Sequence, residues 1–138
     1  IEQIIEEGQA LKHCLDRSDR YFERIANQES YIVFLRRTKA MEQPYYTLEI
    51  EPDGTTRQKR TVGDNQNNDY HRAEKFLKKW QAAIRPRLSQ EDFERQEISR
   101  QLRMYELESL RNDKVTVHGG IHAGELLADI LEADLMEA

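Results

Sequence analysis

The spacing of apolar residues changes several times along the chain, and each change predicts a different element. Apolar positions three and four residues apart predict helices over about 2–16 and 18–27. The run from Tyr31 to Leu35 is apolar and β-branched, which predicts a strand buried on both faces. Strict alternation over 45–51 predicts a second strand with one apolar and one polar face. The apolar set is Tyr46, Leu48 and Ile50, and the polar set is Tyr45, Thr47, Glu49 and Glu51.

A turn and a third, charged strand complete the expected sheet. Pro52-Asp53-Gly54 is a strong turn signal, because Pro presets φ and Gly accepts a positive φ. Residues 55–62 then return as a polar strand rich in Thr, Arg and Lys. Charges discourage edge-to-edge pairing, so we expect this strand at an edge and the apolar strand at the centre. The pattern predicts an α+β fold built on a three-stranded antiparallel meander, about 31–61, packed by flanking helices.

Helical spacing dominates the second half of the chain. Asn68 or Asp69 is expected to cap a helix that Pro86 ends. The segment Ser89-Gln90-Glu91-Asp92 has the form of a capping box, and it begins a charged helix to about residue 111. A last helix is expected over about 121–137. The apolar positions of the long helix are Phe93, Ile98, Leu102, Tyr105 and Leu110.

Length and organisation are consistent with a small domain. The chain has 138 residues, which is enough to bury a core without disulfides or metals. We expect an α+β core at 1–86 and a helical C-terminal extension at 87–138, packed on the core or free to bind a partner. The first residue is Ile1 rather than Met, so we expect the chain to be a fragment of a longer one.

Composition limits the environment and the partners. Cys14 is the single cysteine, and no apolar run approaches the roughly 20 residues that cross a bilayer. We therefore expect a cytoplasmic protein with no membrane contact. The net charge is −5, yet residues 31–90 carry 12 Lys and Arg against 7 Asp and Glu. This excess is typical either of a solvated surface or of a local face that contacts phosphates.

An ordered set of short motifs adds a more specific signal. The motifs are Gly8-Gln9-Ala10-Leu11-Lys12-His13-Cys14-Leu15, Tyr21, Ser30 to Arg37, Pro44 to Ile50 and Gln58-Lys59-Arg60. A helix bearing Trp80 follows them. In this order, residues 8–81 resemble the PcfJ-like family. The resemblance implies a bacterial mobile genetic element, such as a conjugative plasmid, an integrated element or a phage, and it implies no particular reaction.

His13 and Cys14 form the most obvious candidate for catalysis. A histidine beside a cysteine suggests an activated thiolate with the imidazole as base. Adjacent residues on a helix diverge by about 100°, however, so a working partner would have to come from another element. The alternative interpretation is a small buried cysteine that packs beside Leu11 and Leu15.

Polar residues on the second and third strands form the other candidate site. If Glu51 pairs with Thr55, regular pairing places Glu49 opposite Arg57. If the register slips by one residue, Glu49 faces Gln58 and Thr47 faces Arg60. The slipped register would gather these polar side chains on one face. They could then form a catalytic pocket with His13 and Cys14, or simply make ordinary cross-strand pairs.

Other signals for metals and cofactors are weak. His118 and His122 are four residues apart, but Gly119 and Gly120 between them favour a turn over a zinc-binding helix. The sequence has no phosphate-binding loop and no dinucleotide fingerprint, so we expect neither a metal nor a cofactor.

Three functions remain open at this point. The first is a non-enzymatic binding module of a mobile element, which contacts nucleic acid or a DNA-processing protein through a basic sheet region. The residues expected to bind nucleic acid are Arg36, Arg37, Arg57, Lys59 and Arg60. The second is an enzyme that uses His13, Cys14, Glu49 and Gln58. The third is a protein–protein adaptor, with partner docking or homodimer formation through the acidic C-terminal helices.

Overall fold

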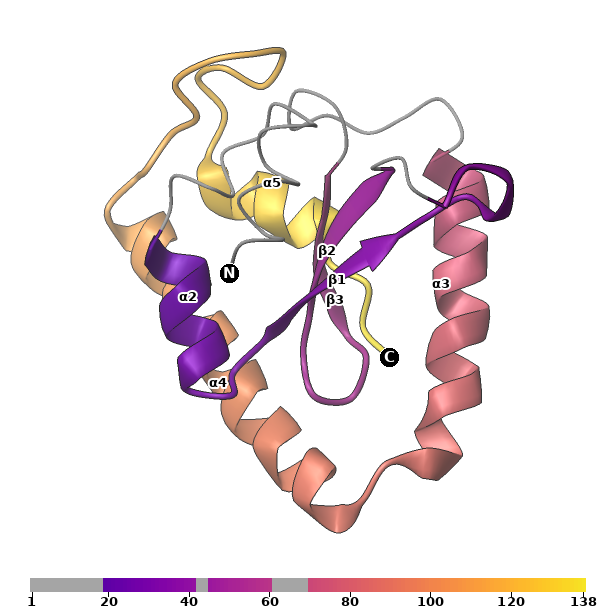
Figure 1. The fold of residues 1–138 in the computed structure, drawn as a ribbon. Coiled ribbons are helices and arrows are strands. Elements are labelled where there is room, and N and C mark those ends of the chain that lie inside the picture. The colour runs from indigo at the N-terminus through magenta and orange to yellow at the C-terminus, as the bar shows by residue number, and fades with distance from the viewer. Residues whose placement is uncertain (1–18, 42–44, 61–69) are drawn as a thin grey trace.

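The computed structural model describes residues 19–41, 45–60 and 70–138. Helices flank a small antiparallel sheet on both sides, which confirms the predicted α+β class (Figure 1). The helices are α2 (Asp19–Ala26), α3 (Tyr70–Ile84), α4 (Gln90–Asn112) and α5 (Leu127–Asp134), with short 3-10 turns η2 (Thr38–Ala40) and η4 (Arg85–Arg87). The strands are β1 (Tyr31–Leu35), β2 (Tyr46–Ile50) and β3 (Thr56–Arg60). Within the described ranges, no helix has the length and apolar character needed to span a bilayer.

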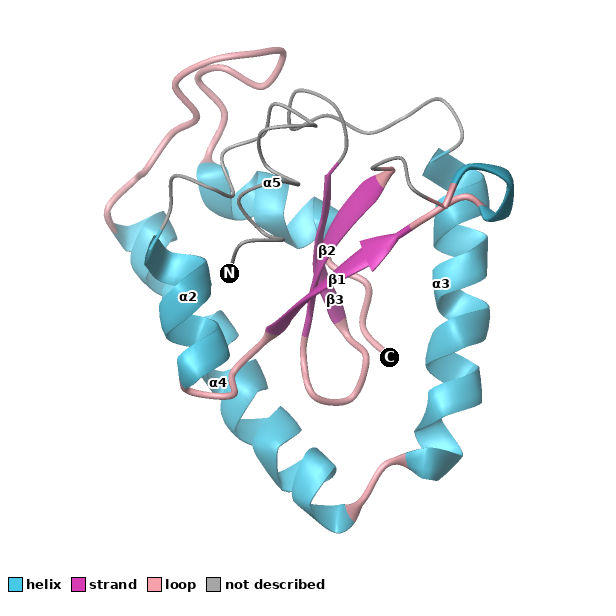
Figure 2. Cartoon of the chain, viewed as in Figure 1, coloured by secondary structure: helices cyan, strands magenta, loops and turns pink. Residues whose placement is uncertain are grey.

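The strand order corrects one sequence expectation. The sheet runs β1-β2-β3, so β2 is the central strand and the apolar β1 lies at an edge (Figure 2). Tyr31 and Val33 remain 37% and 39% exposed, and β1 is therefore not buried on both faces. In a meander the middle position belongs to the second strand whatever its composition, because each hairpin pairs neighbours in the sequence.

The apolar face of β2 holds the main core. Tyr46, Leu48 and Ile50 alternate along the strand as predicted, and all three are buried. They form one cluster with Ala73 and Leu77 of α3. Met136, Leu35, Tyr45 and Trp80 complete this cluster. Helix α3 thus covers one face of the sheet, on the right in Figure 1.

The predicted turn between β2 and β3 adopts the expected chemistry. The Gly54 amide donates to the Glu51 carbonyl at 2.9 Å, and the Thr55 amide donates to Asp53 Oδ1 at 2.8 Å. Gly54 has a φ of +95°, and a Cβ atom there would lie 2.8 Å from Ile84 Cδ1. Both the left-handed backbone and the close approach of α3 therefore require glycine at this position.

A β-bulge reconciles the two registers that the sequence left open. The Glu51 amide donates to the Thr55 carbonyl at 2.8 Å, and Ile50 pairs with Thr56. Glu49 nevertheless faces Gln58, because the register shifts between Glu49 and Ile50. Arg57 is the additional residue on β3. A bulge of this kind lets Arg57 and Gln58 both reach the same face of the sheet.

Strand β3 is not the exposed charged edge that its composition predicts. Lys59 is 1% exposed and Arg57 6%, because α4, α5 and the C-terminal tail cover this strand. The tail adds its own pairing, in which the backbones of Thr56 and Met136 exchange two hydrogen bonds of 2.8 Å. The C-terminal tail thus gives β3 a hydrogen-bonded neighbour that the local sequence pattern does not reveal.

Helix α4 begins with the predicted capping box, and its buried side is polar. Ser89 Oγ accepts from the Asp92 amide at 3.1 Å, and the Ser89 amide donates to Asp92 Oδ2 at 2.8 Å. Hydrogen bonds from the Ser89 backbone and hydroxyl lower the pKa of Asp92. The buried positions of this helix are polar: Gln96, Ser99 and Arg103. The apolar Ile98, Leu102 and Tyr105 are 61%, 45% and 73% exposed.

The last helix is shorter than predicted. It begins at Leu127 rather than near 121, since residues 115–127 form an antiparallel loop first. The Val117 amide donates to the Glu125 carbonyl, and the Leu127 amide donates to the Val115 carbonyl, both at 2.9 Å. Gly120 and Gly124 take positive φ values within this loop, which a continuous helix would not allow.

Candidate functional site

The second face of β2 is a buried layer of charges centred on Glu49. This carboxylate is 2% exposed and accepts two hydrogen bonds from Arg24 Nη1, at 2.9 and 3.0 Å. Ser30 Oγ donates to it at 2.6 Å, and Gln58 Nε2 donates from across the strand pair at 3.4 Å. Glu49 therefore ties α2 and the start of β1 to the middle of the sheet.

Glu51 is the second centre of this layer, and it connects the sheet to α4. Arg57 Nε donates to Glu51 Oε2 at 2.5 Å, and Gln96 Nε2 donates to Oε1 at 2.8 Å. Arg103 Nε approaches the same carboxylate at 3.3 Å. Arg57 Nη2 also donates to the carbonyl and the hydroxyl of Ser99, each at 3.1 Å. The buried polar stripe of α4 is thus complementary to the charged face of the sheet.

Electrostatics keeps the Arg24 guanidinium ionised in spite of its burial. Burial disfavours the charged form of Arg24, but the carboxylates of Glu49 and Glu106 outweigh that effect and raise the pKa of the guanidinium. Buried ion pairs add little net stability compared with an apolar core, and they are costly to break singly. This layer therefore positions α2 and α4 over the sheet rather than exposing a free charge.

The proposed catalytic residues are only partly brought together. Glu49 and Gln58 face each other as in the slipped register, with Nε2 and Oε1 3.4 Å apart. Both hydrogen bonds and ion pairs hold Glu49 inside the charged layer. His13 and Cys14 lie outside the described residues, so their position relative to this pair remains a prediction.

Two of the five proposed nucleic-acid contacts, Arg57 and Lys59, are buried, and a third, Arg60, is half-buried. Arg57 is held by Glu51, as described above, and Lys59 Nζ donates to the Asp134 carbonyl at 2.7 Å. Arg60 Nη1 donates to Asp134 Oδ2 at 2.5 Å. The basic sheet region is consequently not the exposed face expected from sequence, because Glu51 at the end of β2, Ser99 of α4 and Asp134 of α5 hold these side chains.

The other two proposed contacts lie at the surface, at the end of β1. The Arg37 guanidinium stacks 4.4 Å from the centre of the Tyr45 ring, and Arg36 lies 5.3 Å from the Phe34 ring. Arg37 is exposed, and Arg36 is half-buried. Both guanidinium groups thus lie against an aromatic ring.

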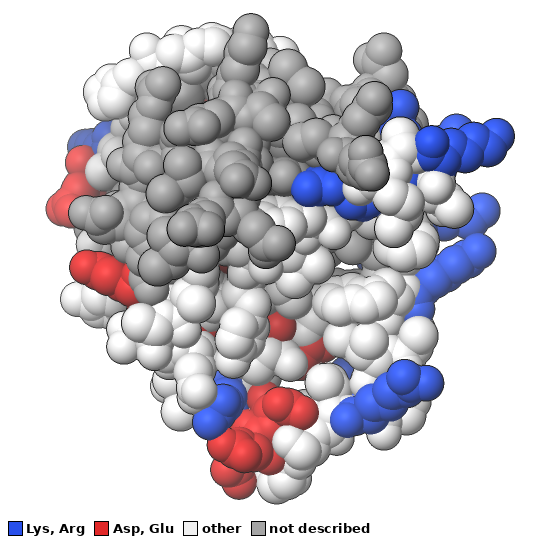
Figure 3. All heavy atoms as spheres, in the orientation of Figure 1, with Lys and Arg blue, Asp and Glu red and all other residues white. Residues whose placement is uncertain are grey.

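Exposed basic residues gather on and beside α3. Figure 3 draws them along the right-hand border, over the region where Figure 1 places α3 and η2. Residues 36–41 and 70–87 together hold nine Lys and Arg and only one acidic residue, Glu74. We call this region the α3 basic surface. Its members are Arg36, Arg37, Lys39, Arg72, Lys75, Lys78, Lys79, Arg85 and Arg87.

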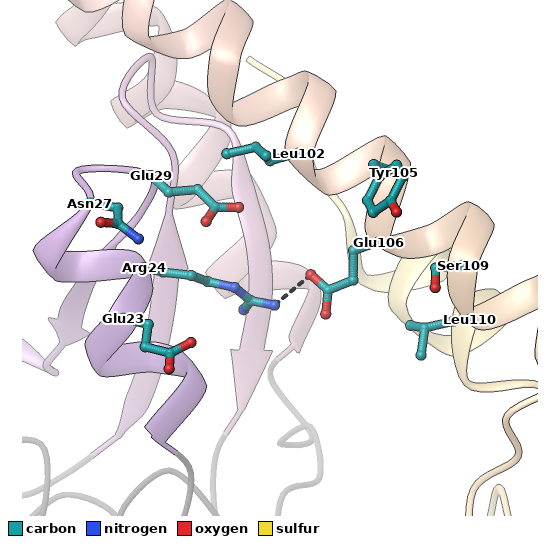
Figure 4. Close-up of a pocket in the computed structure, with 9 residues that line it drawn as sticks. All are labelled: Glu23, Arg24, Asn27, Glu29, Leu102, Tyr105, Glu106, Ser109 and Leu110. Carbon is teal, nitrogen blue, oxygen red and sulfur yellow. Dashed lines mark hydrogen bonds and ion pairs between the residues drawn. The ribbon is translucent and has the colours of Figure 1, made fainter.

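A pocket of about 370 Å³ lies between α2 and α4, away from the α3 basic surface (Figure 4). Arg24 and Glu106 point toward each other across it, with Nη2 and Oε2 2.6 Å apart. Leu102 and Tyr105 of α4 contribute its apolar wall, and Glu23 of α2 contributes a carboxylate. The pocket is therefore an acidic and partly apolar recess beside the exposed side of α4.

Metal-binding geometry is not found in the described ranges. Across 19–41, 45–60 and 70–138, no three His, Cys, Asp or Glu side chains come close enough to hold an ion. His122 Nδ1 lies 2.5 Å from Glu125 Oε2 in the loop before α5. This contact fixes the loop locally, and the turn at Gly119 and Gly120 is as the sequence predicted.

Sequence reasoning missed most of the charged layer. Arg24, Ser99 and Arg103 carried no motif, and polar residues on a helix are normally expected to face water. One signal was present: Gln96, Ser99 and Arg103 recur at spacings of three and four, as an inward-facing stripe does. Such a stripe is informative only when the opposite face of the sheet is known to be charged.

Comparison with known proteins addresses the family and not the chemistry. No curated protein and no solved structure matches this chain. A family model described as "PcfJ-like protein" matches residues 1–75, which is more than half of the 138 residues. The match covers β1, the central strand and β3, together with the start of α3. The chain therefore belongs to the PcfJ-like protein family.

Proposed function

We propose that this chain is a binding module of a bacterial mobile genetic element, and that it contacts nucleic acid through the α3 basic surface. The observation that carries the proposal is the segregation of charge. Nine basic residues and one acidic residue occupy this surface, although the whole chain has a net charge of −5. A basic face on an acidic protein attracts phosphates locally without general adhesion.

The lysines of the surface support this function because they are available. Lys75, Lys78 and Lys79 are exposed, and their ammonium groups have no hydrogen bond or ion pair within the described part of the chain. Free lysines can release condensed counterions when they meet a nucleic-acid backbone. By contrast, the arginines of the charged layer are already neutralised by carboxylates.

An exposed aromatic residue supports nucleic acid over another polyanion. Phe76 is 53% exposed. On the helix it lies four residues after Arg72 and three before Lys79, so both cations are its neighbours. An aromatic ring between cations provides a platform on which an unpaired base can stack, at about 1–3 kcal/mol per base.

The test is fluorescence anisotropy with a short labelled single strand and its duplex, as DNA and as RNA, over a series of salt concentrations. The Lys75→Gln/Lys79→Gln variant should bind more weakly and should reduce the salt slope by about 2, because each lysine that no longer neutralises a phosphate lowers the slope by about 1. Phe76→Ala should weaken single-strand binding and leave duplex binding nearly unchanged.

Lys114→Gln is the matched control, because Lys114 is exposed but lies outside the α3 basic surface. It should bind like the unmodified chain. Weakening in Lys114→Gln by about half as much as in the double variant, which removes twice the charge, would indicate a response to net charge alone. Absence of binding to every oligonucleotide at low salt would rule out the proposed function.

A further inference from the structure

The exposed side of α4 carries a stripe of large apolar residues. Ile98, Leu102 and Tyr105 follow one another at spacings of four and three, so they lie on one side of the helix. They span about 10 Å along its axis. Their exposed fractions of 45% to 73% are unusual for large apolar residues that share one stripe. Their polar counterparts on the same helix are buried, and α4 therefore turns its apolar side to solvent.

Glutamates frame this stripe at both ends. Glu94 precedes Ile98 by one turn, and Glu108 follows Tyr105 by one turn. Both are exposed, and neither has a hydrogen bond or ion pair among the described residues. We call the line Glu94, Ile98, Leu102, Tyr105 and Glu108 the α4 outer face. An apolar centre with a charged rim is the usual anatomy of a protein–protein contact.

The pocket between α2 and α4 extends this face. Leu102 and Tyr105 belong to both, and Figure 4 shows them beside Glu106 on the same helix. Glu23 lies on the opposite wall, and its side chain is exposed and has no partner among the described residues. A basic side chain that entered the pocket would therefore meet the unpaired carboxylate of Glu23. It would also meet the carboxylate of Glu106, which is already ion-paired with Arg24.

We propose that the α4 outer face docks an amphipathic helix of a partner protein that carries Lys or Arg beside its apolar stripe. Apolar residues at matching spacings pack against Ile98, Leu102 and Tyr105, as helices do when they bind apolar grooves. One basic residue enters the pocket toward Glu23 and Glu106, and others approach Glu94 and Glu108. Charge complementarity selects a basic helix over an acidic one. This surface is separate from the α3 basic surface, so the two proposals stand independently.

The probe is a labelled synthetic helical peptide with Leu at alternating spacings of three and four and Lys on both sides of that stripe. Two matched peptides replace every Lys by Glu or every Leu by Ser. The full chain should bind the Leu/Lys peptide and neither of the others. Tyr105→Ala and Leu102→Ala should each weaken binding at least about tenfold, since buried aromatic and aliphatic anchors dominate such contacts.

Glu23→Gln should narrow the preference for the Lys peptide over the Glu peptide, while the apolar anchoring persists. Ile121→Ala is the control, because Ile121 is 82% exposed but lies in the loop before α5. It should leave binding unchanged. Circular dichroism of each variant distinguishes weaker docking by a folded protein from unfolding.

Several outcomes would overturn the proposal. Equal binding of the Leu and Ser peptides would indicate charge attraction without docking, and unaltered binding by Tyr105→Ala would place the contact elsewhere. Sedimentation equilibrium tests the other occupant, a second copy of this chain. A dimer that Leu102→Glu converts to a monomer would make the α4 outer face a homodimer interface instead.

Discussion

Glu49 shows how one carboxylate can organise residues from several elements. It accepts from Arg24 of α2, from Ser30 before β1 and from Gln58 of β3, and it lies on the central strand. Removal of the carboxylate would take an acceptor from all three donors at once. The loss of stability in such a change comes more from the buried partners that remain than from the attraction that is removed.

The substitution Glu49→Gln should therefore destabilise the protein by about 3 kcal/mol or more, because it removes the strongest counter-charge of the buried Arg24 guanidinium. Urea unfolding followed by circular dichroism measures the difference. Glu108→Gln removes the same charge from an exposed, unpaired position and should change stability by less than about 0.5 kcal/mol. Comparable destabilisation in the two variants would mean that the charged layer is not a stabilising unit.

At the scale of elements, the turn at Gly54 and the helix α3 determine each other. Gln81 Nε2 donates to the Gly54 carbonyl at 2.9 Å and to the Met136 carbonyl at 3.0 Å. The turn, the helix and the C-terminal tail therefore meet at one amide group. Any side chain at position 54 would push against Ile84 at the end of α3.

Gly54→Ala is accordingly expected to cost more than the about 1–2 kcal/mol of a left-handed backbone alone, since steric displacement of Ile84 is added. Gly120→Ala provides the control: its φ is +76°, but a Cβ there would meet nothing within 4 Å. The difference in free energy of unfolding between the two variants measures the contact with α3. A difference near zero would show that α3 adjusts freely.

The elements themselves could be predicted well from the sequence, and their surroundings less well. Alternation predicted the two faces of β2, and Pro52-Asp53-Gly54 predicted the turn, because both depend on neighbouring residues only. The position of β1 at an edge follows from the connectivity of the meander and not from its apolar composition. The burial of β3 depends on α4, α5 and the C-terminal tail, which lie far away in the sequence. Patterning also identified the apolar positions of α4 but not its buried polar side, since the charged face that this side covers is not visible in the local sequence.

In the candidate site, too, local features could be predicted and contacts with distant segments could not. The pairing of Glu49 with Gln58 could be stated as one of two registers, but the bulge at Arg57 carries no local signal. The proposed contacts Arg36 and Arg37 are at the surface, whereas the carboxylates of Glu51 and Asp134 hold Arg57, Lys59 and Arg60. The ion pairs of Lys59 and Arg60 with Asp134 join distant segments, and only a structure reveals them.

The whole molecule is a thin sheet between two unlike layers. Toward α3 the contacts are apolar, and toward α2 and α4 they are charged and hydrogen-bonded. The outward sides differ as well, because the α3 side is basic and the α4 side is apolar with free glutamates. This arrangement suits a module that holds two dissimilar partners on opposite sides.

The two layers also indicate that residues after Pro86 belong to the folded unit. Without them Glu51 would lose Gln96 and Arg103, and Thr56 would lose its pairing with Met136. A chain that ends at Pro86 should therefore unfold without a cooperative transition, while the full chain melts in one step. Thermal circular dichroism compares them, and a cooperative transition in the short chain would establish the first 86 residues as an independent domain.

The pairing of Met136 with Thr56 has a consequence for biosynthesis. Strand β3 emerges from the ribosome long before the tail that completes it, so the nascent sheet must wait for residues that have not been translated. During that interval the unpaired edge of β3 and the carboxylates of β2 are exposed. Chaperones can bind such a state, and its edge can pair with a wrong strand. The protein should thus reach its native form only after Met136 has left the exit tunnel.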